Sequence, residues 1–132
     1  MPVAAAAQAS RNAHKSVLVV DDDDDLCGLV ATILRGEGYR VRTASNGAEA
    51  LEDLRAHGLP DLILLDMKMP VMDGWEFARR LDAEYDRRAP VVVISAAENP
   101  AQRAADIGAS DWISKPFDID GLVVAVDKQL RH

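Results

Sequence analysis

The sequence predicts an α/β domain in which five β-strands alternate with five helices. From Ser16 onward, short runs of β-branched and aliphatic residues alternate with segments of helical apolar spacing, as in βαβ units around a parallel sheet. The runs 17–20, 62–65 and 91–94 are apolar throughout, as expected of strands covered on both faces. A chain of 132 residues also fits one domain with one core. We therefore expect a doubly wound (βα)5 fold with helices on both sides of the sheet.

The strands are expected near residues 16–21, 39–44, 61–66, 90–95 and 111–114. The first helix should pack one stripe on the sheet and stop at residues 36–38; this stripe is Leu26, Leu29, Val30, Ile33 and Leu34. The second helix opens at Asn46-Gly47 and closes at residues 58–60, with Ala50, Leu51 and Leu54 as its apolar residues.

The third helix is expected from Gly74 to Arg88, with Trp75, Ala78 and Leu81 facing inward. The fourth runs from Pro100 to Ile107 and ends at Gly108. The fifth covers about Asp118 to Arg131 and turns four apolar residues toward the core, namely Leu122, Val123, Val126 and Leu130.

Composition indicates a soluble globular protein, with 48% hydrophobic and 28% charged residues. The formal charge of −7 argues against a nucleic-acid surface, which normally carries a basic stripe. Residues 1–15 are alanine-rich and lack the compact apolar block of a secretory signal or a membrane span, so we expect a disordered tail before a domain over 16–132 and a cytoplasmic location. The single cysteine, Cys27, lies among apolar residues and is expected in the core.

Acidic residues and one lysine follow the ends of three predicted strands. Asp21 and Asp22 follow the first strand, Asp66 ends the third and Lys115 follows the fifth. In an open parallel sheet the carboxyl ends of the strands lie along one edge, where the ligand crevice forms. These groups should therefore meet in space and form the active site.

Not all five acids at 21–25 are expected to face that crevice. Asp23 is a candidate N-cap, and Asp24 and Asp25 fall in the first helical turn, where negative charge favours the helix dipole. Asp21 and Asp22 instead directly follow a buried strand and would face Asp66. Carboxylates crowded there raise one another's pKa unless a cation neutralises them, and Mg²⁺ suits such oxygen ligands.

The remaining strand ends favour phosphoryl transfer. Asp66 alone could simply cap the next helix. Ser95, however, ends the fourth strand with a hydroxyl, and Lys115 brings an ammonium held by the stiff Pro116 turn. A carboxylate nucleophile, a dication, a hydroxyl and a lysine together meet the needs of phosphoryl transfer, so we expect an acyl phosphate on Asp66.

Five motifs resemble the receiver domain of two-component response regulators. They are Val-Leu-Val-Val-Asp-Asp at 17–22, Leu-Asp-Met-Lys-Met-Pro-Val-Met-Asp-Gly at 65–74, Ile-Ser-Ala at 94–96, Gly-Ala-Ser-Asp-Trp at 108–112 and Ser-Lys-Pro-Phe at 114–117. The motifs come in the family's order and spacing and extend the resemblance over about residues 16–131.

The resemblance implies a flavodoxin-like sheet of strand order 2-1-3-4-5. It implies that Asp66 is phosphorylated by a phosphohistidine of a sensor histidine kinase or phosphotransfer protein. Mg²⁺ would be held by Asp22, Asp66 and the backbone carbonyl of Lys68, with Asp21 acting mainly through a water on the metal. Ser95 and Lys115 would contact the phosphoryl oxygens. Catalysis by the chain would then be limited to its own phosphorylation and dephosphorylation.

The resemblance also implies an output surface made of the fourth helix, fifth strand and fifth helix. In the family the active-site hydroxyl shifts toward the new phosphate and an aromatic side chain, here Trp112, turns inward. Trp112 stands where the family usually has tyrosine or phenylalanine, so it is either a switch or a half-buried surface aromatic. We expect a monomer, or at most a weak dimer, that presents this surface to a downstream protein.

Three other functions each fit part of the sequence. A haloacid-dehalogenase-like phosphatase would use Asp22 and Asp24, but it leaves Asp66 idle and needs a longer chain with a substrate cap. Flavin binding is disfavoured because five aspartates would repel the flavin phosphate. An unphosphorylated docking scaffold is the third.

Overall fold

The structure is a computed structural model that describes residues 12–85, 89–96 and 98–131. Its strands are β1 (Ser16–Val20), β2 (Arg40–Ala44), β3 (Leu62–Asp66), β4 (Val91–Ser95) and β5 (Asp111–Ser114). Its helices are α2 (Asp24–Gly36), α3 (Gly47–His57), α4 (Gly74–Glu84), α5 (Pro100–Ile107) and α6 (Ile119–Leu130). The predicted alternation of strands and helices is confirmed.

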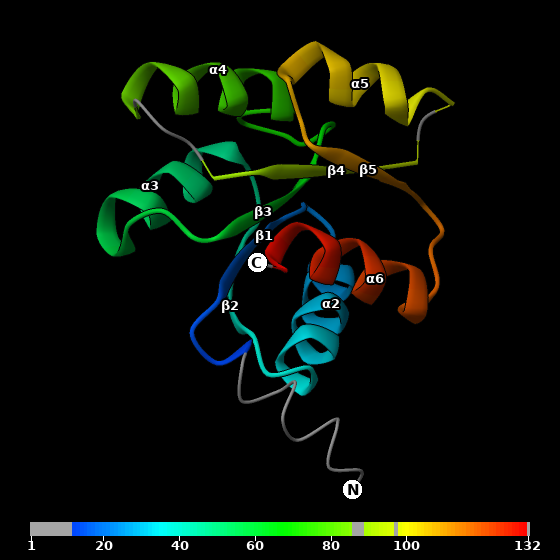
Figure 1. Ribbon diagram of the computed structural model, residues 1–132. Coiled ribbons are helices and arrows are strands. Elements are labelled where there is room, and N and C mark those ends of the chain that lie inside the picture. Colours follow the sequence, from blue (N-terminus) through cyan, green and yellow to red (C-terminus); the bar gives the residue numbers. More distant parts are fainter. Residues whose placement is uncertain (1–11, 86–88, 97, 132) are drawn as a thin grey trace, which may run out of the picture.

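The five strands form one parallel sheet in the order β2-β1-β3-β4-β5, which confirms the flavodoxin-like topology. Helices α3, α4 and α5 cover one face of the sheet, and α2 and α6 cover the other (Figure 1). The chain begins at β1 inside the sheet and reverses its direction of winding between β1 and β3. That reversal places the ends of β1 and β3 side by side.

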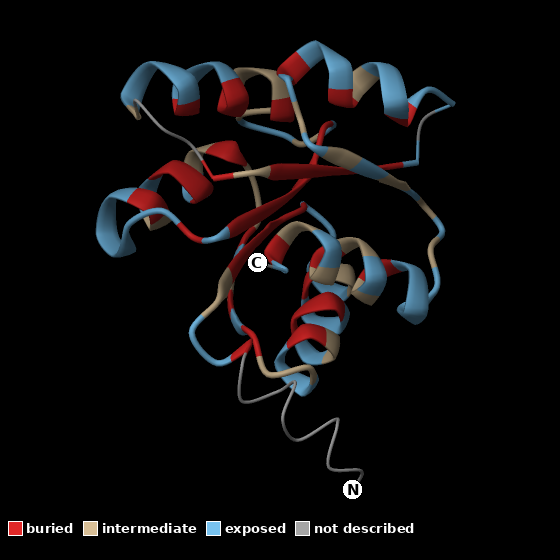
Figure 2. Ribbon diagram, in the orientation of Figure 1, coloured by how far each residue is buried: buried red, intermediate tan, exposed pale blue. Residues whose placement is uncertain are grey.

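Strand residues alternate between the two faces of the sheet and supply both layers of the core. Leu18, Ile63 and Val93 pack with α3, α4 and α5, whereas Leu64 and Val92 pack with α2 and α6. The three central strands are buried along almost their whole length, and the edge strand β5 is only half-buried (Figure 2). Full burial explains why β1, β3 and β4 read as continuous apolar runs.

One residue predicted to face inward, Leu29, is exposed, and a second, Trp75, is only partly buried. Leu29 is 53% exposed, because the buried stripe of α2 is set by smaller side chains, namely Cys27, Val30, Ala31 and Leu34. In α4, the predicted Ala78 and Leu81 are buried and Trp75 packs partly buried against the core, whereas the fully buried Phe77 was not predicted. In α2 the buried stripe is therefore rotated by about one residue from the predicted one, a shift that a 3.6-residue period tolerates when apolar residues are plentiful. The core position of Cys27 is confirmed.

The ends of the chain differ in part from expectation. Asn12 is buried and its side-chain amide donates to the carbonyl of Glu37 at 2.7 Å, so packed structure begins before Ser16. Residues 1–11 lie outside the described residues, and the disordered tail stays a prediction there. Helix α4 ends at Glu84, and the expected end at Arg88 also lies outside them. Among the helices that the structure describes, none has the length and apolar character needed to cross a membrane.

Candidate functional site

The sheet register brings the predicted acids to the same level. Val20 pairs with Leu65 across β1 and β3, so the next residues, Asp21 and Asp66, emerge side by side at the carboxyl edge. Ser95 pairs with Ser114 across β4 and β5, and Lys115 follows directly. The Lys115 amide donates to the Ser95 carbonyl at 2.8 Å, and the Lys115–Pro116 peptide bond is cis. Residues from positions 21, 66, 95 and 115 thus meet at one edge, as predicted.

Both carboxylate oxygens of Asp21 are engaged. Asp21 is 2% exposed; its Oδ1 accepts from the Asp23 amide at 3.0 Å, and its Oδ2 accepts from Lys115 Nζ at 2.7 Å. Burial alone would lower the pKa of Lys115, but the hydrogen bond to Asp21 and the nearby carboxylates raise it above its ordinary value. The lysine therefore stays charged and is anchored to Asp21.

Asp66 is buried and less well neutralised. Its Oδ1 accepts from the Met67 amide at 2.9 Å, whereas Lys115 Nζ lies 3.8 Å from Oδ2. Burial raises the pKa of Asp66 to about 6; repulsion from Asp21 adds to this effect, and Lys115 opposes it. Among the described residues, Lys115 is the cation paired with these clustered carboxylates, so the site favours a further cation.

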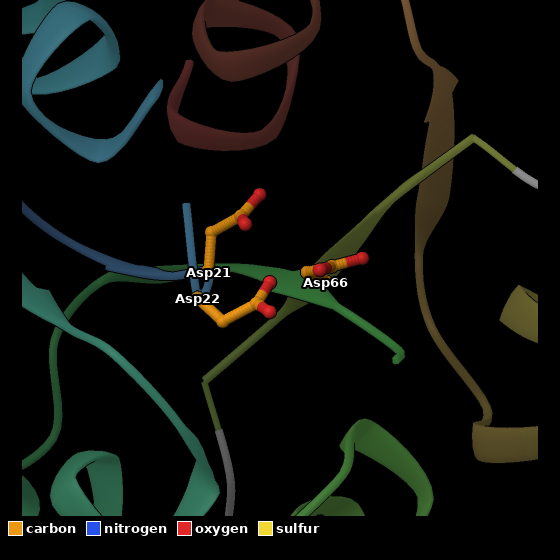
Figure 3. Close-up of side chains that lie close together, drawn as sticks. All are labelled: Asp21, Asp22 and Asp66. Carbon is orange, nitrogen blue, oxygen red and sulfur yellow. The ribbon is translucent and has the colours of Figure 1, made fainter. Parts of the chain in front are cut away.

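Asp21, Asp22 and Asp66 can each offer one carboxylate oxygen to a cation, and these oxygens lie within 4.8 Å of one another (Figure 3). Such a set of hard oxygen donors fits Mg²⁺. Three acids at this spacing would hold Mg²⁺, which would supply positive charge to neutralise them. Because Asp21 already accepts from the Asp23 amide and from Lys115, the better direct ligands are Asp66 and the exposed Asp22.

We predict that Asp22→Ala weakens Mg²⁺ binding by about ten-fold or more, since a direct carboxylate ligand is lost. Asp24→Ala removes the same charge from an exposed position in α2 and should change affinity less than about two-fold. Titration followed by NMR or tryptophan fluorescence compares the two. Equal losses would show that the acids act only as a diffuse negative field.

The other predicted site residues differ in burial and in hydrogen bonding. Asp23 caps α2 by accepting from the Leu26 amide at 3.0 Å, as predicted, and Asp24 and Asp25 are exposed. Ser95 is 3% exposed at the end of β4. Lys68 is exposed beside the site, and its backbone carbonyl as a metal ligand stays a prediction. Trp112 is 44% exposed and does not turn inward in this structure.

One residue at the site was missed. A pocket of about 370 Å³ is lined by Asp66, Lys68, Ser95, Ala96, Arg103 and Lys115. Arg103 comes from the first half of α5, a helix that follows the end of β4. Helices that follow strands begin at the carboxyl edge of a parallel sheet. The position of Arg103 early in such a helix could have indicated that it lies near the site. The sequence did not show, however, toward which side of the helix its side chain points.

The loop after Asp66 is under backbone strain. Gly74 begins α4 so close to β3 that a Cβ there would lie 2.6 Å from Met67 Sδ and 2.9 Å from the Asp66 carbonyl oxygen.

Within the loop, Val71 has a φ of 68° and is 85% exposed. A β-branched residue in this left-handed region is strained by about 1–2 kcal/mol.

Val71→Gly is therefore expected to raise the free energy of unfolding by about 1 kcal/mol, because the relieved strain exceeds the added entropy of the unfolded chain. Val71→Ala keeps a Cβ and should gain less than half as much. Urea denaturation of the three proteins measures the differences. A glycine variant less stable than the native chain would contradict the strain argument.

Comparison with known proteins agrees with this geometry. Residues 17–127 match the family model described as the response regulator receiver domain. The transcriptional regulatory protein PrrA of Mycobacterium tuberculosis is 43% identical over 118 residues, which cover 88% of this chain and 50% of PrrA. The chain spans about half or less of the length of the curated relatives it matches.

Two solved structures match over nearly their full length. A response regulator from Chloroflexus aurantiacus, described as putative, is 32% identical with a TM-score of 0.78 and covers 89% of this chain and 98% of its own. Response regulator TrrA from Thermotoga maritima, solved in complex with Mg²⁺ and BeF, is 32% identical with a TM-score of 0.76, covering 87% of this chain and 98% of its own. Both structures therefore match this chain over most of the residues that its structure describes.

Proposed function

Because the chain belongs to the response regulator receiver domain family, whose members are modules of phosphorylation-dependent two-component signalling, we propose that Asp66 is its phosphoacceptor. The donor would be the phosphohistidine of a sensor histidine kinase or a phosphotransfer protein. The observation that carries the proposal is the convergence of Asp66 with Asp21, Asp22 and Lys115 at one sheet edge.

The chemistry follows from the placement of these groups. A carboxylate oxygen of Asp66 attacks phosphorus; the new P–O bond forms as the P–N bond to the donor imidazole breaks, and that imidazole leaves with the bonding electron pair. Lys115, now 3.8 Å from Asp66, and the Ser95 hydroxyl would stabilise the phosphoryl oxygens. Asp22 and Asp66, with the Lys68 carbonyl, would hold Mg²⁺, which when bound supplies positive charge beside the transferred group. TrrA, with Mg²⁺ and BeF bound, supports this assignment.

Mass spectrometry of the native chain tests the proposal. With Mg²⁺ and a small acyl-phosphate donor, the chain should gain one phosphoryl group, and a chelator should prevent the gain. Peptide mapping should place the group on Asp66. Labelling of Asp22 instead would favour the phosphatase alternative, and no labelling would favour a docking scaffold. The structure gives the phosphatase little support, because Asp24 lies away from the three-acid group with its Oδ1 near Ser45 Oγ, at 3.3 Å.

Phosphorylation would be read by a downstream protein on the surface formed by α5, β5 and α6. This output surface contains Trp112, which is 44% exposed, and Val124, which is 62% exposed. Gly121 and Lys128 are exposed and Ala125 half-buried on the same helix, which leaves little charge there for an acidic chain. Exposed apolar residues and an exposed aromatic side chain on one surface support protein docking. Monomeric or weakly dimeric behaviour remains part of the proposal.

Val124→Glu is accordingly expected to lower phosphorylation-dependent capture of the partner by about ten-fold, the loss typical of a central interface residue. Labelling of Asp66 by the small donor should be unchanged. Ala56→Glu, on the exposed side of α3, is the matched control and should retain capture. Pull-down from a lysate before and after phosphorylation measures both. Unchanged capture by the Val124 variant would move the output surface elsewhere.

A further inference from the structure

Arg103 has unusual surroundings for a helix-surface arginine. It lies on α5, and its guanidinium stands over the ring of Trp75 from α4, with Cζ 5.1 Å from the ring centroid. The two helices lie next to each other on one face of the sheet (Figure 1). Stacking on an indole holds the guanidinium in place without using its N–H donors.

Those donors are not all used. Nη1 of Arg103 is buried and has no hydrogen-bond partner in residues 12–85, 89–96 and 98–131. The acid three residues further along α5, Asp106, is already engaged: it accepts from Trp75 Nε1 at 3.3 Å and from Gln102 Nε2 at 2.9 Å. A buried donor without an acceptor is costly, at about 1–3 kcal/mol, and calls for an explanation.

Arg103 lines two pockets, one over Trp75 and Asp106 and one at the sheet edge, and the pocket at the sheet edge offers an explanation. Its other lining residues include Asp66, Ser95 and Lys115, the groups to which the proposed function assigns phosphoryl transfer. A phosphoryl group on Asp66 would extend from the carboxylate into this pocket and bring acceptor oxygens to it. Arginine suits such a partner, because its planar fork matches phosphate oxygens.

We propose that Arg103 is a phosphate-contacting residue that donates from its guanidinium to the phosphoryl group on Asp66 and so ties α5 to the phosphorylated state. The inference rests on the proposed function and extends it. Lys115 neutralises the group from β5, and Arg103 binds it from α5, so the helix of the output surface contacts the phosphate directly. Trp75 is the positioning residue that aims the guanidinium.

Beryllofluoride, a stable substitute for a phosphoryl group on a carboxylate, tests this in the full chain with Mg²⁺. Arg103→Gln should bind it about ten-fold more weakly, the loss expected for one hydrogen bond to a charged group. Arg103→Lys keeps the charge without the fork and should be intermediate. Arg79→Gln, which removes the same charge from the exposed side of α4, should match the native chain. Arg103→Gln binding as tightly as the native chain would overturn the inference and leave the proposed function standing.

A second measurement is made on the native chain and uses Arg103→Lys only for assignment. In the native chain, the Nε–H resonance of Arg103, assigned by its loss in Arg103→Lys, should move on addition of Mg²⁺ with beryllofluoride and stay in place with Mg²⁺ alone. A resonance that does not move while Asp66 is demonstrably occupied overturns the contact. If neither beryllofluoride nor a phosphoryl group binds the native chain, the proposed function fails, and the inference fails with it.

Discussion

Asp66→Asn is expected to gain no phosphoryl group under conditions that fully label the native chain. Among the described acids at this edge, Asp66 alone is buried at a strand end, lies close to Lys115 and keeps its Oδ2 out of hydrogen-bond distance of any lysine. Asp21 lacks this freedom because Lys115 and the Asp23 amide hold both of its oxygens. An amide in place of the Asp66 carboxylate has no nucleophilic oxygen of comparable strength.

The comparison needs a folded variant and an unaffected control. The Met67 amide can still donate to the asparagine carbonyl, so the end of β3 should keep its local structure. Asp24→Asn removes one charge from the exposed first turn of α2 and should label like the native chain. Intact mass spectrometry at several time points compares the three proteins. Full labelling of Asp66→Asn would place the phosphoacceptor at another carboxylate.

The strands and the site could be predicted because both follow from rules that tolerate small errors. A strand buried on both faces must be apolar throughout, and that condition identified β1, β3 and β4 within a residue at each end. Once strands are parallel, their carboxyl ends share an edge, so Asp21, Asp66 and Lys115 had to come together whatever the details of the helices. That rule could not predict that Lys115 pairs with Asp21, at 2.7 Å, in preference to Asp66, at 3.8 Å.

Helix orientation was less predictable. Rotating a helix by one residue still buries an apolar stripe, so Leu29 could be assigned inward although Cys27 occupies the core, and the buried Phe77 was not predicted. The same uncertainty hid Arg103. Its guanidinium stands over Trp75 of the neighbouring helix and lines the pocket, and that contact depends on how α4 and α5 pack. Packing between helices is a tertiary effect that no local pattern encodes.

The raised pKa of Asp66 leads to a second large effect, on stability. A carboxyl group whose pKa is higher in the folded than in the unfolded chain stabilises the fold below the unfolded value, and this contribution is lost as pH rises through the folded value. For Asp66 the window runs from 3.8 to about 6. Above this window, the ionised Asp66 carboxylate lowers the free energy of unfolding by about 3 kcal/mol, because each unit of pKa shift corresponds to about 1.4 kcal/mol.

Asp66→Asn lacks this titration and should therefore be the more stable protein at pH 7.5 in the presence of a chelator, by about 2–3 kcal/mol. The difference should shrink as pH falls toward 4, where the native carboxyl group is protonated. Urea denaturation across this range measures it, and Asp24→Asn, at an exposed position, should stay within about 0.5 kcal/mol of the native chain throughout. Saturating Mg²⁺ should reverse the order at pH 7.5, since the cation binds the native acid cluster more tightly than the variant and adds its binding energy to the fold. If the stability difference between Asp66→Asn and the native chain depends on neither pH nor Mg²⁺, Asp66 is not the carboxyl group whose pKa is raised at this site.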